Sequence, residues 1–292
     1  MEIKMITWPS PAKLNLFLYI NGQYSNGYHQ LQTLICFLSY WDTITIIPNN
    51  RGKITLYSSL KEIPMENNLI VRAGKLLQQY IVKKNLFFKN PGAEITLIKR
   101  LPIGGGLGGG SSNAATTLIA LNYLWNTHLT IDDLTFLGLQ LGCDVPVFVK
   151  GYAAFAEGLG HKLQPVQLPE KWYLILVPDI QISTALIFKD PELKRNTPIR
   201  TLQELLYITP FSNDCEWIVR KRYQEIEKIF QCLSNNAIIS RMTGTGSCIF
   251  CEFDNKFMAY HLLKQFSKWK YHAFIAQGLN ISPLHSFYSI IR

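Results

Sequence analysis

The chain has 292 residues, which is enough for one large domain or two of ordinary size. Its 48% hydrophobic and 17% charged content is typical of a globular protein, and no run approaches the roughly 18 apolar residues of a membrane helix, so we expect a cytoplasmic protein with no signal peptide and no membrane partner. The formal net charge of +9 favours a polyanionic ligand, but the basic residues are scattered in short groups, and we expect no nucleic-acid partner.

An alternating stretch near the N-terminus predicts the first strand. Over residues 13–20, one face carries Leu14, Leu16, Leu18 and Ile20, and the other carries Lys13, Asn15, Phe17 and Tyr19. Lys13 and Asn15 are therefore expected side by side, although an edge lysine taken alone is more often solvated than catalytic. Turn signals over residues 21–27 then place Tyr28 and His29 on or beside a loop.

Two short strands, a helix and another strand come next. Residues 43–47 and 53–57 alternate as strands, and residues 69–81 carry apolar side chains at helical spacing, with Asn67 or Asn68 as the expected cap. Residues 94–98 alternate as a strand directly before a run of glycines.

The glycine-rich stretch over residues 102–115 is the most informative part of the chain. Six glycines, at positions 104, 105, 106, 108, 109 and 110, lead into Ser111, Ser112 and Asn113 and then into a small, apolar helix. Glycine costs backbone entropy, and bare N–H groups at the start of a helix can surround an anion, so this density favours a phosphate site. The alternative, a flexible surface turn, is disfavoured because linkers rarely run straight into an apolar helix.

The loop lacks the features of the best-known phosphate sites. A Gly-Lys-Ser/Thr ending is absent, which excludes a Walker A loop, and protein-kinase signatures are absent too. Gly104-x-Gly106-x-x-Gly109 formally matches the dinucleotide fingerprint. The acids at the required distance, Asp132 and Asp133, begin a predicted helix and do not end a second strand, which argues against dinucleotide binding.

An aspartate and a hairpin close the first half. A second amphipathic helix is predicted over residues 134–141, and Asp144 follows in the sequence Gly-Cys-Asp-Val-Pro. Without further context Asp144 is best explained as a helix N-cap, with a proline near the first helical position. Residues 152–163 alternate as a hairpin, and the polar stretch over residues 164–171 is a predicted domain boundary.

The second half predicts three strands, two helices and another glycine-rich turn. The strands are expected over residues 172–177, 248–253 and 273–276, the helices over residues 213–233 and 256–266, and the turn over residues 243–247. Asn213 with Glu216 three residues later is a capping signal for the first helix. Cys248 and Cys251 form a CxxC, but positions three apart in a strand point to opposite faces and no second CxxC exists, so we expect both to be small buried hydrophobes.

Three stretches together resemble one family of enzymes. Residues 11–16 (PAKLNL), 107–112 (LGGGSS) and 242–247 (MTGTGS) are similar to the three motifs of the small-molecule kinases named after galactokinase, homoserine kinase, mevalonate kinase and phosphomevalonate kinase, the GHMP kinases. Residues 26–33 (NGYHQLQT), 142–146 (GCDVP) and 188–193 (FKDPEL) look like the branch of this family that phosphorylates a cytidyl substrate. The similarity runs nearly end to end.

The resemblance implies a two-domain α+β fold with the active site in the cleft between the domains. The N-terminal domain, residues 1–163, would share the fold of a ribosomal protein S5 domain (S5 domain 2-like), and the C-terminal domain, residues 164–292, would be ferredoxin-like. The enzyme would use ATP and Mg²⁺ to phosphorylate a small cytidyl substrate, as a monomer or a weak homodimer.

The resemblance also assigns roles to particular residues. Lys13 and Asp144 fall on the catalytic positions, where Asp144 would accept the hydroxyl proton and Lys13 would be the cation beside it. The phosphates of ATP would be held by Pro102, Ile103, Gly104, Gly105, Gly106, Leu107, Gly108, Gly109, Gly110, Ser111 and Ser112. Asn68 and Lys99 match positions near the adenine pocket, although either could equally be a helix cap or a solvated charge. The Mg²⁺ ligands stay open, with Ser112 or only water and phosphate as the alternatives.

The remaining positions concern the cytidyl substrate. Tyr28 and Phe188 fall on positions that sandwich the base, His29 on the position that reads its edge, and Asn15 nearer the reacting end. Taken alone, Phe188 is best explained as ordinary core, since aromatic residues dominate cores.

Rival interpretations come from other classes of protein. A catalytically inactive ligand sensor is disfavoured by the retained Lys13 and Asp144, and an RNA-binding protein by the absence of interleaved aromatic and basic residues. Another kinase of the same family is the nearer alternative.

Overall fold

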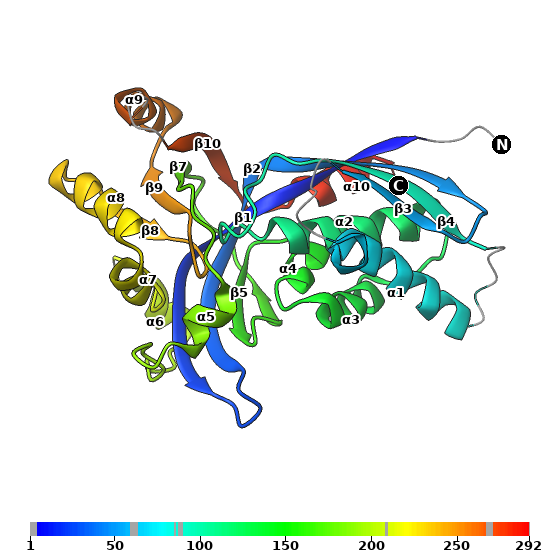
Figure 1. The fold of residues 1–292 in the computed structure, drawn as a ribbon, viewed down its shortest axis with the longest axis horizontal. Helices are drawn as coiled ribbons and strands as arrows, with labels where there is room; N and C mark the ends of the chain where they lie inside the picture. Colours follow the sequence, from blue (N-terminus) through cyan, green and yellow to red (C-terminus); the bar gives the residue numbers. More distant parts are fainter. Residues whose placement is uncertain are drawn as a thin grey trace.

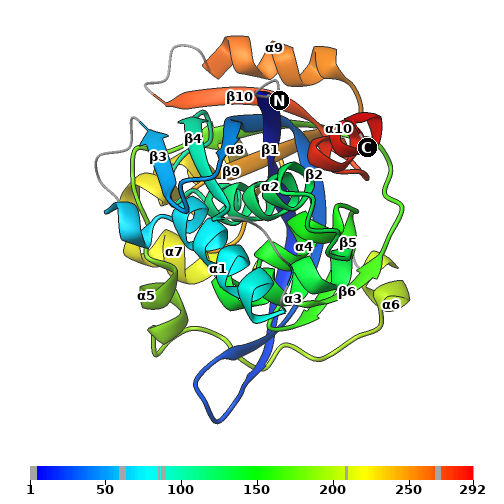
Figure 2. The same cartoon turned by 90° about the vertical axis from the view of Figure 1, so that its right-hand side faces the viewer.

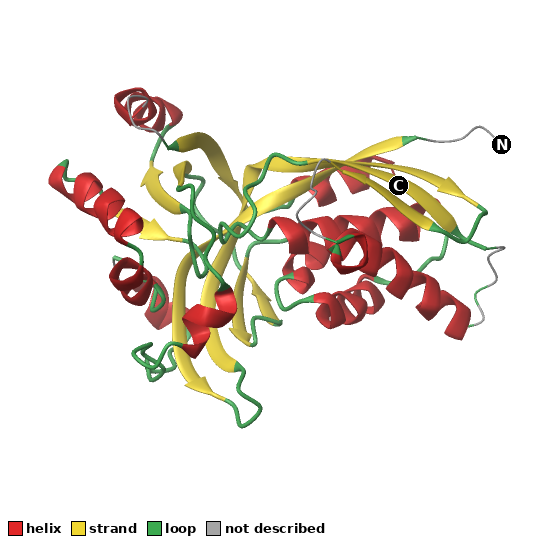
Figure 3. Cartoon of the chain, in the orientation of Figure 1, coloured by secondary structure: helices red, strands yellow, loops and turns green. Residues whose placement is uncertain are grey.

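The computed structural model describes residues 5–58, 64–84, 86, 90–207, 210–266 and 271–291. The molecule is elongated, with helices α1–α4 gathered under one end of a long sheet and helices α5–α9 around the other end (Figure 1). We call these ends the N-terminal lobe and the C-terminal lobe. In each lobe the helices cover a β-sheet, so the molecule mixes helix and sheet in two layers (Figure 3).

Two long antiparallel strands connect the lobes. β1 (Ile6–Gln23) pairs with β2 (His29–Asn49) along nearly its whole length, and β2 also pairs with β10 (His272–Leu279) of the C-terminal lobe. Both lobes therefore share one continuous sheet in the order β3-β4-β2-β10-β7-β9-β8.

The predicted single alternation along the first strand is wrong, because β1 contains bulges. Register shifts lie between Pro11 and Lys13 and between Asn15 and Phe17, and each bulge resets which face a side chain meets. As a result, Leu14 and Phe17 belong to one buried cluster while Leu18 belongs to another. Lys13 and Asn15 nevertheless stay side by side, as predicted.

The N-terminal lobe is built from the following elements: β3 (Ile54–Ser58), η1 (Met65–Asn67), α1 (Leu69–Lys83), β4 (Gly92–Ile98), α2 (Gly109–Leu124), α3 (Ile131–Leu141), α4 (Val145–Lys150), β5 (Ala154–Gly158), β6 (Lys162–Pro165) and α10 (Pro283–Ile291). β4 lies between β2 and β3, antiparallel to the first and parallel to the second. A capping box of Thr130 and Asp133 begins α3, which is the predicted helix start that argued against the dinucleotide fingerprint.

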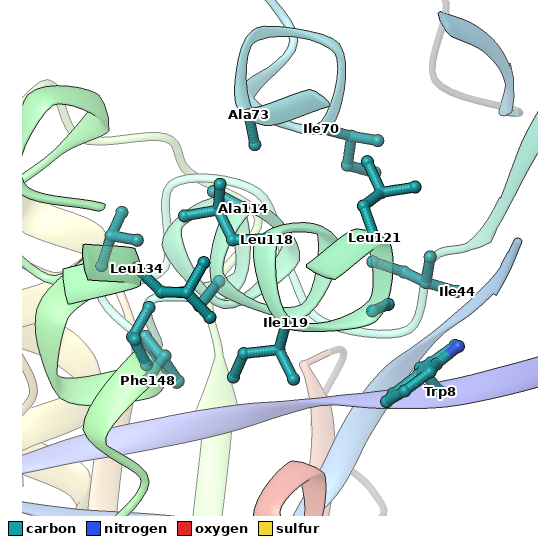
Figure 4. Close-up of a cluster of buried hydrophobic side chains, with 14 of the residues drawn as sticks. Trp8, Ile44, Ile70, Ala73, Ala114, Leu118, Ile119, Leu121, Leu134 and Phe148 are labelled. Atoms are coloured by element: carbon teal, nitrogen blue, oxygen red, sulfur yellow. The ribbon is translucent and has the colours of Figure 1, made fainter. Parts of the chain in front are cut away.

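Helix α2 is the centre of this lobe. It is buried on nearly every side, between α1, α3 and α4 and the sheet, as Figure 4 shows for Leu118, Ile119 and Leu121. Small residues such as Ala114 let the neighbouring elements approach it closely. A helix that is buried all round has no freedom to shift, so its N-terminus holds a fixed position in the molecule.

The C-terminal lobe contains β7 (Trp172–Val177), α5 (Thr184–Lys189), α6 (Leu202–Tyr207), α7 (Glu216–Arg222), α8 (Gln224–Asn235), β8 (Ser240–Met242), β9 (Ile249–Phe253) and α9 (Lys256–Phe266), with β10 closing the sheet. Its strands run antiparallel in the order β10-β7-β9-β8. The succession of strand, helices, two strands, helix and strand is the ferredoxin-like pattern, which confirms that prediction.

Two details of this lobe concern the predicted elements. The helix expected over residues 213–233 is in fact two, α7 and α8, because Tyr223 between them has extended backbone angles. The Asn213 side chain accepts from the Cys215 N–H, while the Glu216 carboxylate accepts from the Met242 N–H and takes no part in a capping box. Cys248 and Cys251 are buried in different clusters on opposite faces of the sheet, as predicted.

The last helix returns to the first lobe. α10 packs against β1, and Figure 2 shows it at the same side of the molecule as the N-terminus. Leu284 of this helix belongs to the same buried cluster as Trp8. The chain thus crosses between the lobes more than once, and the predicted domain boundary between residues 163 and 164 stays a prediction. Among the described residues, no helix is both long and apolar enough to span a membrane.

Candidate active site

A cavity of about 1170 Å³ lies between the lobes. Its lining comes from β1 and the start of β2, from the glycine loop, from the start of α4, and from α5 and the turn before β9. Every predicted site residue except Ser112 lines it. Residues more than 170 positions apart in the sequence, such as Lys13 and Phe188, thus meet around one space.

Lys13 and Asp144 face each other in this cavity. The Lys13 ammonium nitrogen lies 3.5 Å from an Asp144 carboxylate oxygen, with the Lys13 side chain 3% exposed and that of Asp144 41% exposed. Lys13 also donates to the Asn15 side-chain oxygen, and Asn15 in turn donates to Thr33 at 2.8 Å. The buried Lys13 ammonium is therefore held by Asn15 next to the Asp144 carboxylate, which is exposed enough for a ligand to reach it.

Asp144 occupies the N-cap position of α4, but its carboxylate makes no capping hydrogen bond. The cap explanation thus accounts for where Asp144 lies in the sequence and leaves its side chain unexplained. Among the described residues that line the cavity, Asp144 is the one carboxylate, against the four cationic side chains of Lys13, Lys99, Lys189 and Arg195. This imbalance suits a ligand with several negative charges.

The start of α2 forms another wall of the cavity. Gly109, Gly110 and Ser111 open the helix and line the space, while the first α-helical bond of this turn runs from the Ser112 N–H to the Gly108 carbonyl at 2.8 Å. The N–H groups of the first turn have no partner within a helix and carry partial positive charge. They are a ready anion site.

The glycines of the loop differ in why a side chain is absent at each position. A Cβ at Gly106 would lie 2.2 Å from the Thr243 carbonyl oxygen, and a Cβ at Gly108 would lie 2.8 Å from the Phe148 ring. Both residues also have left-handed φ, +77° and +72°. These two glycines are required by close packing inside the protein. Gly110 differs, because its nearest neighbour for a Cβ is Leu69 at 3.5 Å and its surface is exposed.

A buried aspartate fixes both ends of the glycine loop. Asp42 is 0% exposed and accepts hydrogen bonds from the N–H groups of Arg100 and Leu101 at 2.7 and 2.8 Å and from the Asn113 side chain at 3.0 Å. The Lys99 ammonium donates to it at 2.5 Å. Lys99 is therefore no solvated charge: it forms a buried ion pair at the cavity wall, and burial lowers its pKa.

Of the two remaining residues predicted for the phosphate side, one lines the cavity and the other does not. Asn68 caps α1 by accepting from the Ile70 N–H at 3.0 Å and also lines the cavity, so the cap is confirmed and the place near the adenine stays a prediction. Ser112 is fully buried, and its hydroxyl accepts from Ser10 at 2.9 Å. The serine that reaches the cavity is Ser111, which corrects the expectation that Ser112 could contact Mg²⁺ there.

Aromatic side chains line the opposite end of the cavity. His29 stacks on Phe188 with ring centroids 4.7 Å apart and planes 24° apart, and Tyr28 stands beside them, 57% exposed. Phe188 is partly buried and packs against the core of the C-terminal lobe, so it is at once a core residue and a wall of the cavity. Burial and the neighbouring Arg195 lower the pKa of His29.

Two residues of the site were absent from the sequence prediction. Arg195 contacts His29, and Asp42 anchors the glycine loop. Arg195 stands in the sequence as one of 29 lysines and arginines, and Asp42 as a polar residue in a strand, so neither carried a local signal. The extension of the FKDPEL stretch by two residues would have reached Arg195.

Family models and solved structures agree on the kind of protein. The model for the N-terminal domain of GHMP kinases matches residues 68–152, and the model for their C-terminal domain matches residues 193–272. A crystal structure of 4-(cytidine 5'-diphospho)-2C-methyl-D-erythritol kinase is similar, with 28% identity, 94% of this chain and 99% of that chain covered, and a TM-score of 0.78.

More distant structures share the fold. Mevalonate kinase from Methanococcus jannaschii is 17% identical, with 96% and 99% coverage and a TM-score of 0.63. Homoserine kinase from Cytophaga hutchinsonii is 16% identical, with 97% of both chains covered and a TM-score of 0.64. With the two-lobed architecture and the cavity between the lobes, these matches show that the chain belongs to the GHMP kinase family and has its two-domain α+β fold.

Proposed function

We propose that this protein transfers the γ-phosphoryl group of ATP to the 2-hydroxyl of 4-(cytidine 5'-diphospho)-2-C-methyl-D-erythritol, giving the 2-phosphate and ADP. The reaction belongs to the methylerythritol phosphate route to isoprenoid precursors. The observation that carries the proposal is the Lys13–Asp144 pair, 3.5 Å apart, between an anion-binding helix start and an aromatic pocket. The 28% identity to a solved kinase of this substrate supports the choice of acceptor.

The phosphate end of the cavity would hold ATP. The first-turn N–H groups of α2 and the loop before it would meet the phosphates, and Lys99 and Asn68, which line the same cavity, would lie toward the adenine. Mg²⁺ commonly takes most of its ligands from phosphate and water, and a cavity whose described lining has a single carboxylate fits that mode, with the Ser111 hydroxyl nearby. Bound there, the ion would supply positive charge that neutralises the phosphates of ATP.

The catalytic pair would act on the acceptor hydroxyl. Phosphoryl transfer passes through a loose transition state, so positioning and charge stabilisation dominate. Asp144 accepts the proton of the 2-hydroxyl as the oxygen attacks. Lys13, held by Asn15, offers its charge to the transferred phosphoryl group and keeps Asp144 in place. Asn15 itself stands where it can contact the polyol.

The base end would select the cytidine. Tyr28 and Phe188 offer flat faces for stacking, and His29 offers a ring nitrogen to the edge of the base. Because His29 already covers part of one face of Phe188, the base would lie beside His29 and not between the two rings.

A direct assay tests this function. Protein incubated with Mg-ATP and the cytidyl substrate should release ADP, and the phosphate should appear on the 2-hydroxyl by ³¹P NMR. The alternative is another GHMP kinase, since mevalonate and homoserine kinases share the fold. Mevalonate, homoserine and galactose should therefore be offered singly and in competition. Faster phosphorylation of one of these, with no product from the cytidyl compound, would refute the proposed acceptor.

A further inference from the structure

Arg195 connects two segments that are 166 positions apart in the sequence, the segment after α5 and the start of β2. Its guanidinium donates to the backbone carbonyls of Phe188 and Asp190, both at 2.8 Å, and to that of Leu193 at 2.9 Å. These bonds wrap the chain after α5 around one side chain. The third guanidinium nitrogen, Nε, donates to His29 at the start of β2, 2.9 Å from its Nε2 atom.

This contact determines where His29 carries its proton. A guanidinium has five N–H donors and no acceptor, and it stays charged at any pH a protein tolerates. His29 Nε2 must therefore accept, which leaves the single proton of the neutral ring on Nδ1. In the described part of the chain no hydrogen-bond partner is recorded for Nδ1, and His29 lines the cavity.

We propose that Arg195 is a positioning residue that holds His29 neutral with Nδ1 as an obligatory donor, so that the site selects cytosine and rejects uracil. The inference rests on the proposed function and deepens it. Burial and the Arg195 charge both lower the pKa of His29, in agreement with a neutral ring.

The Nδ1–H donor of His29 can distinguish cytosine from uracil, because the two bases differ at ring position 3. Cytosine offers an unprotonated ring nitrogen at position 3, whereas uracil carries a hydrogen there and would oppose donor to donor. The planes of His29 and Phe188 are within 24° of each other. An in-plane hydrogen bond from Nδ1 thus puts the base nearly parallel to the Phe188 ring, in the layer where stacking on an aromatic face is favourable. Selection and stacking require the same pose.

The first test needs no ligand. ¹⁵N NMR of histidine-labelled protein, with His29 assigned among the six histidines by a His29→Gln variant, reports which ring nitrogen bears the proton. The wild type should show the Nδ1–H form at neutral pH. Arg195→Met removes every donor and should yield a mixture of both forms, while Arg195→Lys keeps one donor and should retain more of the Nδ1–H form.

The second test measures selection by calorimetric titration with CDP and with UDP. The wild type should prefer CDP by at least about tenfold, which one mismatched hydrogen bond supplies. Arg195→Met should lose this preference, mainly by weaker CDP binding, and its KM for ATP should stay unchanged. Arg222→Met is the matched control, because Arg222 pairs with Asp190 and Glu192 on the same segment but does not contact His29. It should keep the preference.

The outcomes separate the inference from the proposed function. A wild-type His29 protonated on Nε2, or an Arg195→Met protein that keeps the CDP preference, would overturn the inference even if the cytidyl substrate is phosphorylated. An Arg195-dependent preference for CDP in a protein that does not phosphorylate the cytidyl substrate would refute the proposed function and leave the inference standing. Equal loss of preference in Arg222→Met would reduce Arg195 to a structural residue.

Discussion

The two ends of the cavity are built in different ways. The phosphate end is a continuous stretch of chain at the start of a largely buried helix, fixed by hydrogen bonds to Asp42 and by the turn at Thr243. The base end joins the β1–β2 hairpin to the irregular segment after α5 through Arg195 and through hydrogen bonds such as that from the Gln32 side chain to the Arg200 carbonyl. The first end is rigid because of the core beneath it, and the second depends on part-buried hydrogen bonds of Arg195 and on the packing of Phe188 against the C-terminal core.

This difference separates what each end can recognise. Backbone N–H groups on a fixed helix suit phosphate, which all nucleotides and all members of a kinase family share. Side chains on connecting segments can change without disturbing the core, so they are suited to choosing the acceptor. A family with many substrates is expected to keep the first end and vary the second.

The largest effect is expected at the reacting centre between the two ends. Asp144→Asn removes the proton acceptor but keeps the size of the side chain, and general-base catalysis contributes about 10²- to 10⁴-fold in rate. We expect kcat to fall by that amount, with the KM for ATP and CDP binding little changed, because neither end is altered. Steady-state ADP release and calorimetry check this. Near-native kcat with an intact circular dichroism spectrum would show that Asp144 is not the base.

The rigidity of the phosphate end depends on the buried Asp42–Lys99 pair. Asp42→Ala leaves the Lys99 ammonium and the Arg100 and Leu101 N–H groups without their acceptor, and breaking a buried pair from one side costs about 3–5 kcal/mol. Urea unfolding should show a loss of this size in the free energy of unfolding.

An exposed ion pair gives the control for that measurement. Asp132 pairs with Lys150 at the surface, where its side chain is 86% exposed, and Asp132→Ala should cost less than about 1 kcal/mol. Similar small losses in both variants would mean that Asp42 does not hold the loop.

The same contrast explains what could be predicted from the sequence. The glycine loop, Lys13 and Asp144 lie in contiguous motifs whose residue types have a chemical meaning on their own, so their gathering around one cavity could be expected. The helix cap at Asn68 and the opposite faces of the two cysteines followed from local periodicity.

What escaped prediction depends on distant partners. Asp42 is explained by residues 57 to 71 positions away, and the place of Arg195 in the site by a histidine 166 positions away. The bulges in β1 are set by pairing with β2 and not by the β1 sequence, so the alternation of Leu14 to Ile20 could not reveal them. The glycines looked alike in the sequence, although Gly106 and Gly108 face protein atoms.

A smaller effect is expected at the base end. Base–aromatic stacking is worth roughly 1–3 kcal/mol, so Phe188→Ala should weaken cytidyl-substrate binding by about 10- to 100-fold and leave the KM for ATP unchanged. Leu186→Ala is the control, since Leu186 is on the same helix but is 63% exposed and does not line the cavity. Equal loss of ATP binding in Phe188→Ala would show that the ring acts through the core.

The smallest effect, and the sharpest for the phosphate end, is expected at Gly110. Alanine there meets no steric conflict, since its Cβ would be 3.5 Å from Leu69, and replacing a helical glycine should raise the free energy of unfolding by about 0.4–1 kcal/mol. The added methyl group would nevertheless stand where phosphate approaches the helix, so the KM for ATP should rise, by less than about tenfold. Gly106→Ala should instead lower the free energy of unfolding, because its Cβ would lie 2.2 Å from the Thr243 carbonyl oxygen. A Gly110→Ala protein that is more stable yet binds ATP more weakly would identify a glycine kept for a ligand, whereas unchanged ATP kinetics would move the phosphates away from the first turn of α2.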